Sequence, residues 1–364
     1  MLSQRNQTLV QVSGSLDAKL GGPYSVVLDT LRFLEVNFDH KLLIFGTCSI
    51  QGKNIKTVPT LKNNRYGLPS LAIKKYGLKE FKNTEILLIH GFYLFSTLIA
   101  LFFFPTNKIY LMPHGSLEAY QERNRRVRKY VFRYLLKIVL RGRRIHFLIG
   151  SNPEKVSILE IYPDAKITVV GLGVHTTNVG IEKSRKSNEP VKLFCVSRIS
   201  EKKRIDLCIR ALSKLNSHKL RYTLDIIGSG NFALELELRK LVSDLNLENQ
   251  VAFSGFLEGA KKTDAISGAD IFLLPSENEN FAVAVAESIS LGKPVVVSKH
   301  VAMHEFVDRH HTGITLNSLD VDALAKAIET INEGYALFQK QCLESAHLLD
   351  WKDVQKKWLQ ALNS

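Results

Sequence analysis

Short apolar runs alternate with amphipathic stretches along almost the whole chain, and this alternation limits the possible folds. The runs have the length and composition of buried strands: 8–12, 41–46, 85–89, 108–112, 146–149, 167–170, 191–196, 222–227, 270–274 and 294–298. Helical periodicity separates many of them, as at 23–36, 204–215, 232–245 and 321–332. A repeated strand–helix–strand pattern predicts an α/β fold with parallel sheets that carry helices on both faces.

The length of the chain indicates more than one domain. Its 364 residues exceed the roughly 250–300 residues at which a single hydrophobic core stops growing. Residues 176–190 (TTNVGIEKSRKSNEP) lose apolar periodicity and are polar, which is typical of a linker. We predict two doubly wound, Rossmann-like domains, at 1–176 and 191–345, with a linker at 177–190. Two such domains facing each other would bind a ligand in a cleft at the carboxyl ends of both sheets.

The composition is that of a soluble globular protein, with 45% hydrophobic and 23% charged residues. The first residues, MLSQRNQTLVQVSG, contain no basic region followed by a long apolar one, so we expect no secretory signal and a cytoplasmic location. The 13 apolar residues FYLFSTLIALFFF at 92–104 are fewer than the roughly 20 that span a bilayer. The four cysteines are scattered without metal-type spacing, which predicts reduced thiols.

Basic residues are concentrated in the first half of the chain. Residues 1–180 hold 25 Lys and Arg against 11 Asp and Glu, an excess of 14, whereas residues 181–364 hold 24 against 24. The first half therefore carries the whole formal charge of +14. This asymmetry predicts that the first domain meets an anionic partner, which could be a lipid surface, a phosphorylated acceptor or nucleic acid.

Two short motifs follow expected strands. In KLGGPYSVV, Gly21 and Gly22 lie between the first strand and a helix that opens with Pro23. Bare backbone amides at this place suit a phosphate, and a simple tight turn fits equally well. In VSRISEKKRID, Arg198 and Lys203 follow the strand that opens the second domain. Two cations there could hold a diphosphate, and solvated surface charges are the alternative.

A third motif, PSENENFAVAVAESISLGKPVV at 275–296, places two glutamates eight residues apart around an apolar run. We expect Glu279 in a loop after a buried strand and Glu287 in a helix over 282–291. At helical spacing the two would lie about 12 Å apart, farther than the roughly 5 to 9.5 Å of paired carboxylates in glycoside hydrolysis. The pair therefore suits two parts of one extended ligand. The alternative is a polar loop and an exposed helical glutamate, which the apolar neighbours of Glu287 fit poorly.

These motifs, in this order, resemble those of the retaining glycosyltransferases of family 4, the "group 1" enzymes with the GT-B fold. The segment at 275–296 is similar to the family's nucleotide-sugar motif, in which seven residues separate two glutamates. The resemblance continues along nearly the whole chain through GGPYSVV, PHGSLE, SNPEK, VGLGVH, VSRISEKKRID, IIGSG, VAFSGF and ADIFLLPS. The closing HLLDWKDVQKKWLQAL resembles the family's last helix, so 346–364 is expected to cross back onto the first domain.

The resemblance implies how the phosphates of a donor would be held. Gly22 would offer its backbone amide to them, and Arg198 and Lys203 would neutralise the departing diphosphate, so that no metal ion is required. No cofactor is implied beyond the nucleotide-diphosphate sugar, which is the donor substrate. His300 and His304 lie four residues apart but lack an evident third ligand, and zinc is not expected there.

The sugar and nucleoside ends of the donor are assigned in the same way. Glu279 would bind hydroxyls of the donor sugar, with amides near Phe281 and Ala282 helping, and Glu287 would bind the ribose. His114 matches the family histidine that reaches the sugar from the first domain. The implied catalytic set is thus His114, Arg198, Lys203 and Glu279.

Three departures from the family pattern bear on these roles. Ala282 replaces a glycine, which leaves the amide available but makes a positive φ costly. Leu172 and His175 replace the usual asparagine and aspartate of the interdomain stretch, which weakens any role for that loop. Arg204 replaces a glycine and would add a cation near the phosphates.

Residues 121–144 form a strongly basic helix candidate. One apolar face is expected to pack inward and consists of Val127, Tyr130, Val131, Tyr134, Leu135 and Ile138. The second stripe consists of Phe132, Leu136 and Leu140, with Arg125, Lys129 and Arg133 beside it. An apolar stripe bordered by cations suits a helix that lies on anionic lipid, and packing against a neighbouring helix suits it equally well.

The sequence therefore predicts a retaining, metal-independent glycosyltransferase that acts at the inner face of a membrane. It would move a sugar from a nucleotide-diphosphate sugar to a saccharide acceptor, lipid-linked, in the biosynthesis of cell-surface polysaccharide or lipopolysaccharide. The alternatives are a nucleotide-sugar epimerase of the same architecture and a non-catalytic protein that binds anionic polymers. Basic and aromatic residues interleave at 128–134, but without the signature of a nucleic-acid module, so nucleic acid is not expected as a partner.

Overall fold

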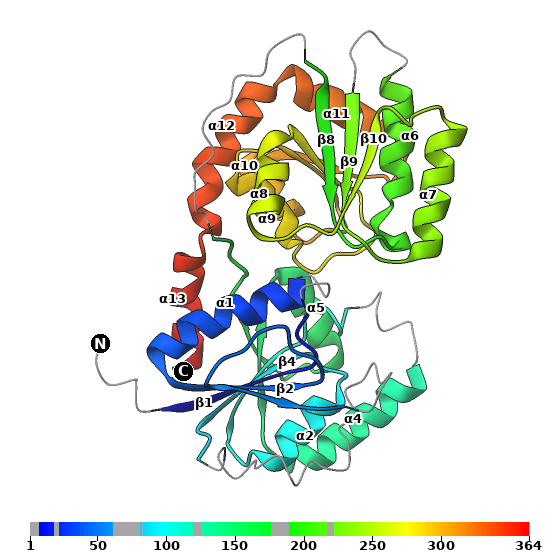
Figure 1. The fold of residues 1–364 in the computed structure, drawn as a ribbon. Coiled ribbons are helices and arrows are strands. Elements are labelled where there is room, and N and C mark those ends of the chain that lie inside the picture. The colour runs from blue at the N-terminus through cyan, green and yellow to red at the C-terminus, as the bar shows by residue number, and fades with distance from the viewer. Residues whose placement is uncertain are drawn as a thin grey trace. The chain divides into compact units, whose positions relative to one another are not determined.

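The chain folds into two compact α/β units, as a computed structural model shows (Figure 1). The structure describes residues 7–17, 22–60, 81, 83–118, 126–175, 189–216 and 222–363. One unit comprises Met1–Gly171 with Gln355–Ser364, and the other comprises Leu172–Val354. The predicted fold class, two doubly wound α/β domains with parallel sheets, is confirmed. Most of the linker predicted at 177–190, up to residue 188, lies outside the described residues.

The first unit is built on a parallel sheet with the strand order β3-β2-β1-β4-β5-β6-β7. Its strands are β1 (Thr8–Ser13), β2 (Asp39–Phe45), β3 (Ile55–Val58), β4 (Ile86–His90), β5 (Lys108–Met112), β6 (Ile145–Ile149) and β7 (Lys166–Val169). Its helices are α1 (Gly22–Asn37), α2 (Phe95–Phe103), α4 (Arg126–Leu140) and α5 (Asn152–Ile161). Leu42 and Ile44 of β2 pack with α1 on one face, and Leu43 and Phe45 join α2, α4 and α5 on the other.

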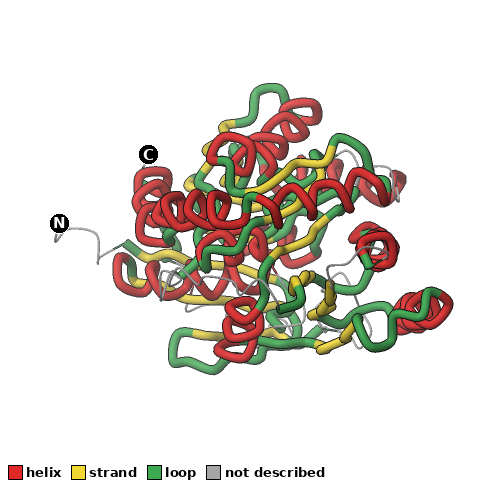
Figure 2. Tube along the Cα trace, turned by 90° about the horizontal axis from the view of Figure 1, so that it is seen from above, coloured by secondary structure: helices red, strands yellow, loops and turns green. Residues whose placement is uncertain are grey.

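The second unit has a parallel sheet with the strand order β10-β9-β8-β11-β12-β13. Its strands are β8 (Val191–Val196), β9 (Tyr222–Ile227), β10 (Val251–Gly255), β11 (Ile271–Leu274), β12 (Val295–Ser298) and β13 (Gly313–Leu316). Its helices are α6 (Ile205–Leu215), α7 (Phe232–Asp244), α8 (Gly259–Gly268), α9 (Val283–Ser290), α10 (His304–His310), α11 (Val321–Glu333) and α12 (Tyr335–Ser345). Figure 2 shows strands, in yellow, flanked by helices, in red.

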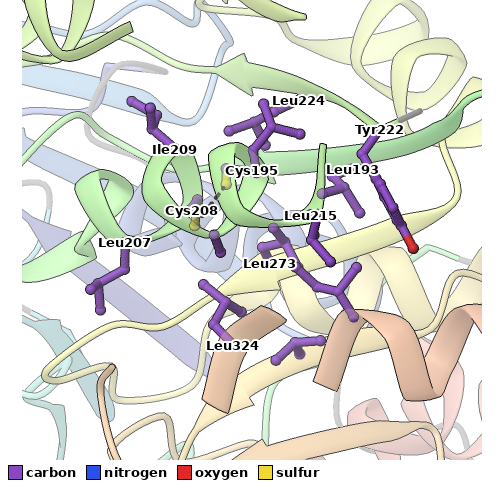
Figure 3. Close-up of a cluster of buried hydrophobic side chains, with 14 of the residues drawn as sticks. Leu193, Cys195, Leu207, Cys208, Ile209, Leu215, Tyr222, Leu224, Leu273 and Leu324 are labelled. Atoms are coloured by element: carbon purple, nitrogen blue, oxygen red, sulfur yellow. Dashed lines mark hydrogen bonds between the residues drawn. The ribbon is translucent and has the colours of Figure 1, made fainter. Parts of the chain in front are cut away.

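Alternate residues of each strand enter two separate cores, because side chains alternate across a sheet. In the second unit, Leu193 and Cys195 of β8 pack with α6 and α11 (Figure 3) and with α7, whereas Phe194 packs with α8, α9 and α10 on the other face. Burial on both faces explains why the strands appear in the sequence as continuous apolar runs. The sulfur of Cys195 lies 3.7 Å from that of Cys208, and both thiols are free.

Both sheets reverse their strand order at one point, and these points define where each unit can bind a ligand. The reversal lies between β1 and β4 in the first unit and between β8 and β11 in the second. Loops that leave the carboxyl ends of two such neighbouring strands run in opposite directions and leave a crevice, where doubly wound folds bind ligands.

Three strands were not predicted from the sequence, namely β3, β10 and β13, and each lies at the edge of its sheet. An edge strand is less buried than a central one, and β10 alternates between exposed and half-buried residues. Its sequence VAFSG therefore lacks the continuous apolar run that identifies a central strand.

The final helix, α13 (Trp351–Leu362), ends within the first unit. Trp358 is buried there with its ring edge-on to Phe33 at 6.0 Å. The Tyr110 hydroxyl donates to the Leu362 carbonyl at 3.2 Å. The expectation that the last helix crosses back onto the first domain agrees with these contacts. No helix in the described ranges combines the length and apolarity needed to cross a bilayer.

Candidate functional site

The candidate site of the second unit is formed by two loops at the point where its sheet reverses. One loop follows β8 and carries Arg198 and Lys203, and the other follows β11 and carries Glu279. The backbone N–H of Glu277 donates to the Lys202 carbonyl at 2.8 Å and joins the two loops. The structure therefore brings together three residues that the sequence analysis placed at one ligand.

Two lysines share one oxygen of Glu279. Nζ of Lys203 lies 2.6 Å from Oε1 of Glu279, and Nζ of Lys202 lies 3.1 Å from the same atom. Burial alone would raise the pKa of Glu279, but attraction by Lys203 and Lys202 outweighs it, so that the pKa is lowered. Burial lowers the pKa of Lys203, and Glu279 opposes that shift. The carboxylate is ionised and held against two cations at neutral pH.

Arg198 differs from these lysines because its side chain is exposed. It lies close enough to Lys203 for its charge to contribute to the lowered pKa of that lysine, a shift caused chiefly by burial. Two cations near each other at the carboxyl edge of a sheet favour an anionic ligand, and a guanidinium suits phosphate oxygens particularly well.

The sequence analysis expected Arg204 to add a cation for phosphate, but in the structure its guanidinium is paired with carboxylates of the protein. Its guanidinium forms two hydrogen bonds of 3.1 Å with Asp206 and lies 3.5 Å from Glu277. Its backbone has φ +50°, in the left-handed region. That conformation accounts for the glycine usual at this position, and the two carboxylates stabilise the arginine that replaces it.

The loop that carries Glu279 is held on its other side by the segment after β12. The Glu279 N–H donates to the His300 carbonyl at 3.0 Å, and the Glu279 carbonyl accepts from the Ala302 N–H at 2.9 Å. The Ser298 hydroxyl also donates to the Ser276 carbonyl. Backbone contacts from two sides therefore fix the position of the Glu279 carboxylate.

Ala282 begins α9 in an unusual conformation. Its φ of +67° and ψ of +71° lie in the left-handed region, which costs a non-glycine residue roughly 1–2 kcal/mol. The sequence analysis treated a positive φ here as unfavourable, and the chain adopts it despite the missing glycine. Phe281, half-buried, packs on the core beneath α9. The turn places the amides of this segment at the amino end of α9, where an anion is stabilised.

Glu287 lies within α9, five residues after Ala282, and is half-buried. Its Oε1 is 2.5 Å from Nζ of Lys262 on α8. Sequence reasoning selected Glu287 because its neighbours are apolar, but missed Lys262, since nothing in the spacing connects residues 262 and 287. The pair forms an ion pair that joins α8 to α9.

Two glycines after β9 allow the loop after β8 to approach closely. A Cβ at Gly228 would lie 1.9 Å from the Ser197 carbonyl oxygen, and one at Gly230 would lie 2.3 Å from that of Ile199. The Ile199 N–H donates to the Ser229 carbonyl at 3.1 Å. The IIGSG motif thus supports the backbone on both sides of Arg198.

In the first unit, His114 lies next to a buried histidine. Nε2 of His114 is 3.0 Å from Nδ1 of His90, and the two ring planes are inclined by only 19° with their centroids 5.2 Å apart. His90 also contacts Gln11, at 2.9 Å. Loss of hydration lowers the pKa of His114 to about 4 and that of His90 well below its usual range. Both rings are therefore neutral at pH 7.

Gly22 is the first residue of α1, so the helix begins one residue before the start that the sequence analysis expected at Pro23. The glycine before it, Gly21, lies outside the described residues. Gly22 is half-buried and starts a helix of 16 residues, so its amide is at the positive end of that helix.

The orientation predicted for the basic helix, α4, is wrong. Leu136 is buried, and Phe132 and Leu140 pack against the same core, so the stripe proposed for lipid faces inward. Arg133 donates to the Tyr93 hydroxyl, and Lys129 lies over the Tyr93 ring. Arg125 lies outside the described residues.

The other face of α4, predicted to pack inward, is the exposed one. The exposed fraction reaches 78% for Val127 and 74% for Tyr130. The exposed apolar face, as we call it below, consists of Val127, Tyr130, Val131, Tyr134, Leu135 and Ile138. The helix is apolar around most of its circumference, so periodicity alone could not decide which stripe the core takes.

Solved structures with the same fold include glycosyltransferases. HepE of Anabaena, in a structure with UDP and glucose, aligns over 98% of this chain and 99% of its own, with a TM-score of 0.78 and 17% identity. WaaG, a glycosyltransferase involved in lipopolysaccharide biosynthesis, aligns over 96% and 98%, with a TM-score of 0.74 and 12% identity. The fold is the GT-B fold of glycosyltransferases.

Sequence comparison relates the second unit to one family of enzymes. Residues 178–346 match the family model "Glycosyl transferases group 1". The amylovoran biosynthesis glycosyltransferase AmsK of Erwinia amylovora is 29% identical over 180 residues, 48% of this chain and 44% of its own length. The putative colanic acid biosynthesis glycosyltransferase WcaL of Escherichia coli K12 is 29% identical over 177 residues, which are 47% of this chain and 43% of its own length. The second unit is thus similar to the group 1 glycosyl transferases, and the aligned stretch spans less than half of the length of these relatives.

Proposed function

We propose that the protein is a retaining, metal-independent glycosyltransferase that transfers a sugar from a nucleotide-diphosphate sugar to a saccharide acceptor. The observation that carries the proposal is the position of Arg198, Lys203 and Glu279 on two loops at one reversal point of the sheet. Negative charge develops on the departing diphosphate in such a transfer, and fixed cations at that place lower the barrier.

The donor would lie along the carboxyl edge of the second sheet. Arg198 and Lys203 would hold the diphosphate, and Glu279 would accept hydrogen bonds from hydroxyls of the sugar. The amides near Phe281 and Ala282 would assist at the start of α9. HepE is described in complex with UDP-glucose, and this supports a nucleoside diphosphate as the leaving group here.

Other residues would complete the site. Glu287 would bind the ribose through its carboxylate, oriented by Lys262 at 2.5 Å. In the first unit, Gly22 would offer its amide to the phosphates and His114 would contact the sugar. These roles follow the family pattern and the helix-start position of Gly22.

The product would be a surface saccharide, assembled on a lipid-linked acceptor at the inner face of a membrane. The names of AmsK and WcaL refer to amylovoran and colanic acid biosynthesis, which supports polysaccharide assembly. The excess of 14 positive charges in residues 1–180 and the exposed apolar face of α4 support contact with anionic lipid.

Product analysis tests the proposal. The protein is incubated with UDP, GDP, ADP and CMP sugars, with and without a saccharide acceptor mixture, and the products are identified by mass spectrometry. A sugar added to acceptor with release of the nucleoside diphosphate is expected, and the anomeric configuration of the new bond should match that of the donor. An epimerised donor without transfer would replace this account with the epimerase alternative, and inversion would contradict the retaining mechanism.

A further inference from the structure

We propose that Gln11 and His90 are positioning residues that fix the proton of neutral His114 on its Nδ1 atom. His114 then presents an N–H donor, and never a bare nitrogen, to an oxygen of its ligand. The purpose of this arrangement rests on the proposed function, whereas the position of the proton follows from hydrogen bonds within the first unit.

Thr30 on α1 sets the orientation of the Gln11 amide. The Thr30 hydroxyl donates to the Val26 carbonyl at 2.8 Å, so its oxygen is left to accept. It accepts from Nε2 of Gln11, also at 2.8 Å. Oε1 of Gln11 then faces Nε2 of His40 at 3.0 Å and accepts from it. Each contact agrees with the same orientation of the amide.

The Gln11 amide then determines the tautomer of His90. Nε2 of Gln11 lies 2.9 Å from Nε2 of His90. An amide nitrogen can only donate, so Nε2 of His90 is the acceptor and carries no hydrogen. The His90 ring is buried and neutral, which leaves its single N–H on Nδ1.

His90 passes the same constraint to His114. The Nδ1–H of His90 points to Nε2 of His114 at 3.0 Å. Nε2 of His114 must therefore accept, and a neutral His114 ring carries its hydrogen on Nδ1. Within the described residues, the His114 ring forms its hydrogen bond through Nε2, and Nδ1 has no protein partner. Nδ1–H remains for a ligand oxygen.

The backbone of His114 is held as firmly as its ring. Its φ is +53°, and that of Gly115 is +74°, a pair of left-handed residues that needs support from its surroundings. The buried carboxylate of Glu154 gives this support by accepting from the Gly115 N–H at 2.7 Å and the Gly150 N–H at 3.3 Å. The ring is thus fixed in position, orientation and protonation.

A fixed donor matters because a sugar offers oxygen lone pairs as well as hydroxyl hydrogens. With Nδ1 protonated, His114 attracts an oxygen lone pair, whereas a bare Nδ1 would repel it. Gln11 is a polar residue in the middle of the buried strand TLVQVS, and its burial is otherwise costly. Its three hydrogen bonds account for its presence there.

Nitrogen NMR of the full-length protein, labelled with ¹⁵N-histidine, measures the tautomer directly. The His114 signals are identified by their loss in His114→Gln. At pH 7.5 the wild-type protein should show protonated Nδ1 and bare Nε2 at His114. A protonated Nε2 would overturn the proposal without any further variant.

Two substitutions at His90 separate positioning from simple packing. His90→Asn leaves an amide N–H near the place of Nδ1–H and should preserve the His114 tautomer and turnover. His90→Leu removes the donor and should allow Nε2–H at His114, with kcat lower by about tenfold. An unchanged tautomer in His90→Leu would contradict the proposal, and a changed tautomer with unchanged kcat would contradict its role in transfer. Absence of turnover in the wild type would count against the proposed function. The nitrogen NMR spectrum would still show which tautomer of His114 is present.

Discussion

Nζ of Lys203 lies 2.6 Å from Oε1 of Glu279, across two loops separated by 76 residues of sequence. The proposed ligands of the diphosphate and of the sugar are therefore in direct contact. Because each charge lies in a largely buried setting, each depends on the other to remain ionised. This ion pair would fix the position of Lys203 beside the diphosphate and of Glu279 beside the sugar, on the two sides of the bond that breaks.

Lys203→Ala should reduce donor turnover by about 10²–10³-fold, because it removes one fixed charge from the departing diphosphate. Lys202→Ala should have a smaller effect, since it leaves the 2.6 Å contact between Lys203 and Glu279 intact. Lys214→Ala is the matched control, because Lys214 pairs with Asp322 on the exposed surface. Initial rates of nucleoside diphosphate release measure all three. Equal rates for Lys203→Ala and Lys214→Ala would remove Lys203 from the site.

Ala282→Gly should raise the free energy of unfolding of the second unit by about 0.5–1 kcal/mol. The substitution relieves a left-handed φ of +67°, and the added freedom of glycine in the unfolded chain offsets part of that gain. Ala265→Gly, inside α8, should instead lower it by about 0.5–1 kcal/mol. Urea denaturation compares the two variants. A loss of stability in both would show that Ala282 is not strained.

The first unit should lose stability as the pH falls from about 6.5 to about 4. Burial lowers the pKa of His40 from 6.5 to about 4. Between these values the unfolded chain binds a proton that the folded state excludes, so the free energy of unfolding falls with pH. At about 1.4 kcal/mol per pKa unit, the loss from His40 amounts to at most about 3.5 kcal/mol.

His40→Gln tests this assignment, because it keeps an N–H donor for Gln11 and removes the titrating ring. Its stability should depend less on pH than that of the wild type in the same window. Trp358 fluorescence in a Trp351→Phe background follows the unfolding of the first unit, to which Trp358 belongs. The same pH dependence in both proteins would exclude His40 as a cause. Glu279 does not interfere, since its pKa is lowered and its stabilisation is lost only below about pH 4.

The exposed apolar face of α4 should bind anionic vesicles, and more weakly as salt is raised. Tyr130→Ser with Tyr134→Ser should reduce binding at least about tenfold through lost apolar contact. Phe232→Ser is the control, since Phe232 is an equally exposed aromatic residue, at 73%, on α7 of the second unit. Charge reversal at Arg133 is less informative, because that side chain holds Tyr93. Sedimentation that shows no salt-sensitive binding would remove membrane contact from the account.

Much of the fold was predictable because central parallel strands are buried on both faces and so appear as apolar runs. The edge strands β3, β10 and β13 lack that signal. The orientation of α4 was reversed because two of its faces are apolar, and packing with α2 selects one of them. Periodicity locates a helix, but the neighbours of the helix determine which face is buried.

The candidate site was predictable where its residues follow adjacent strands at a reversal of the sheet. Arg198, Lys203 and Glu279 meet this condition. Lys262 and Gln11 do not, because their partners are far away in sequence and no spacing rule connects them. A glutamine inside an otherwise apolar strand is the one signal that could have identified Gln11, since a buried amide requires partners.

Calorimetric titration of UDP, GDP, ADP and CMP sugars into the wild type, Lys203→Ala and Glu287→Ala tests the central claim most directly. We predict that at least one nucleotide class binds the wild type, and that both substitutions weaken its binding at least about tenfold. Equal affinity of that donor for all three proteins would place its binding site elsewhere in the chain and contradict the account.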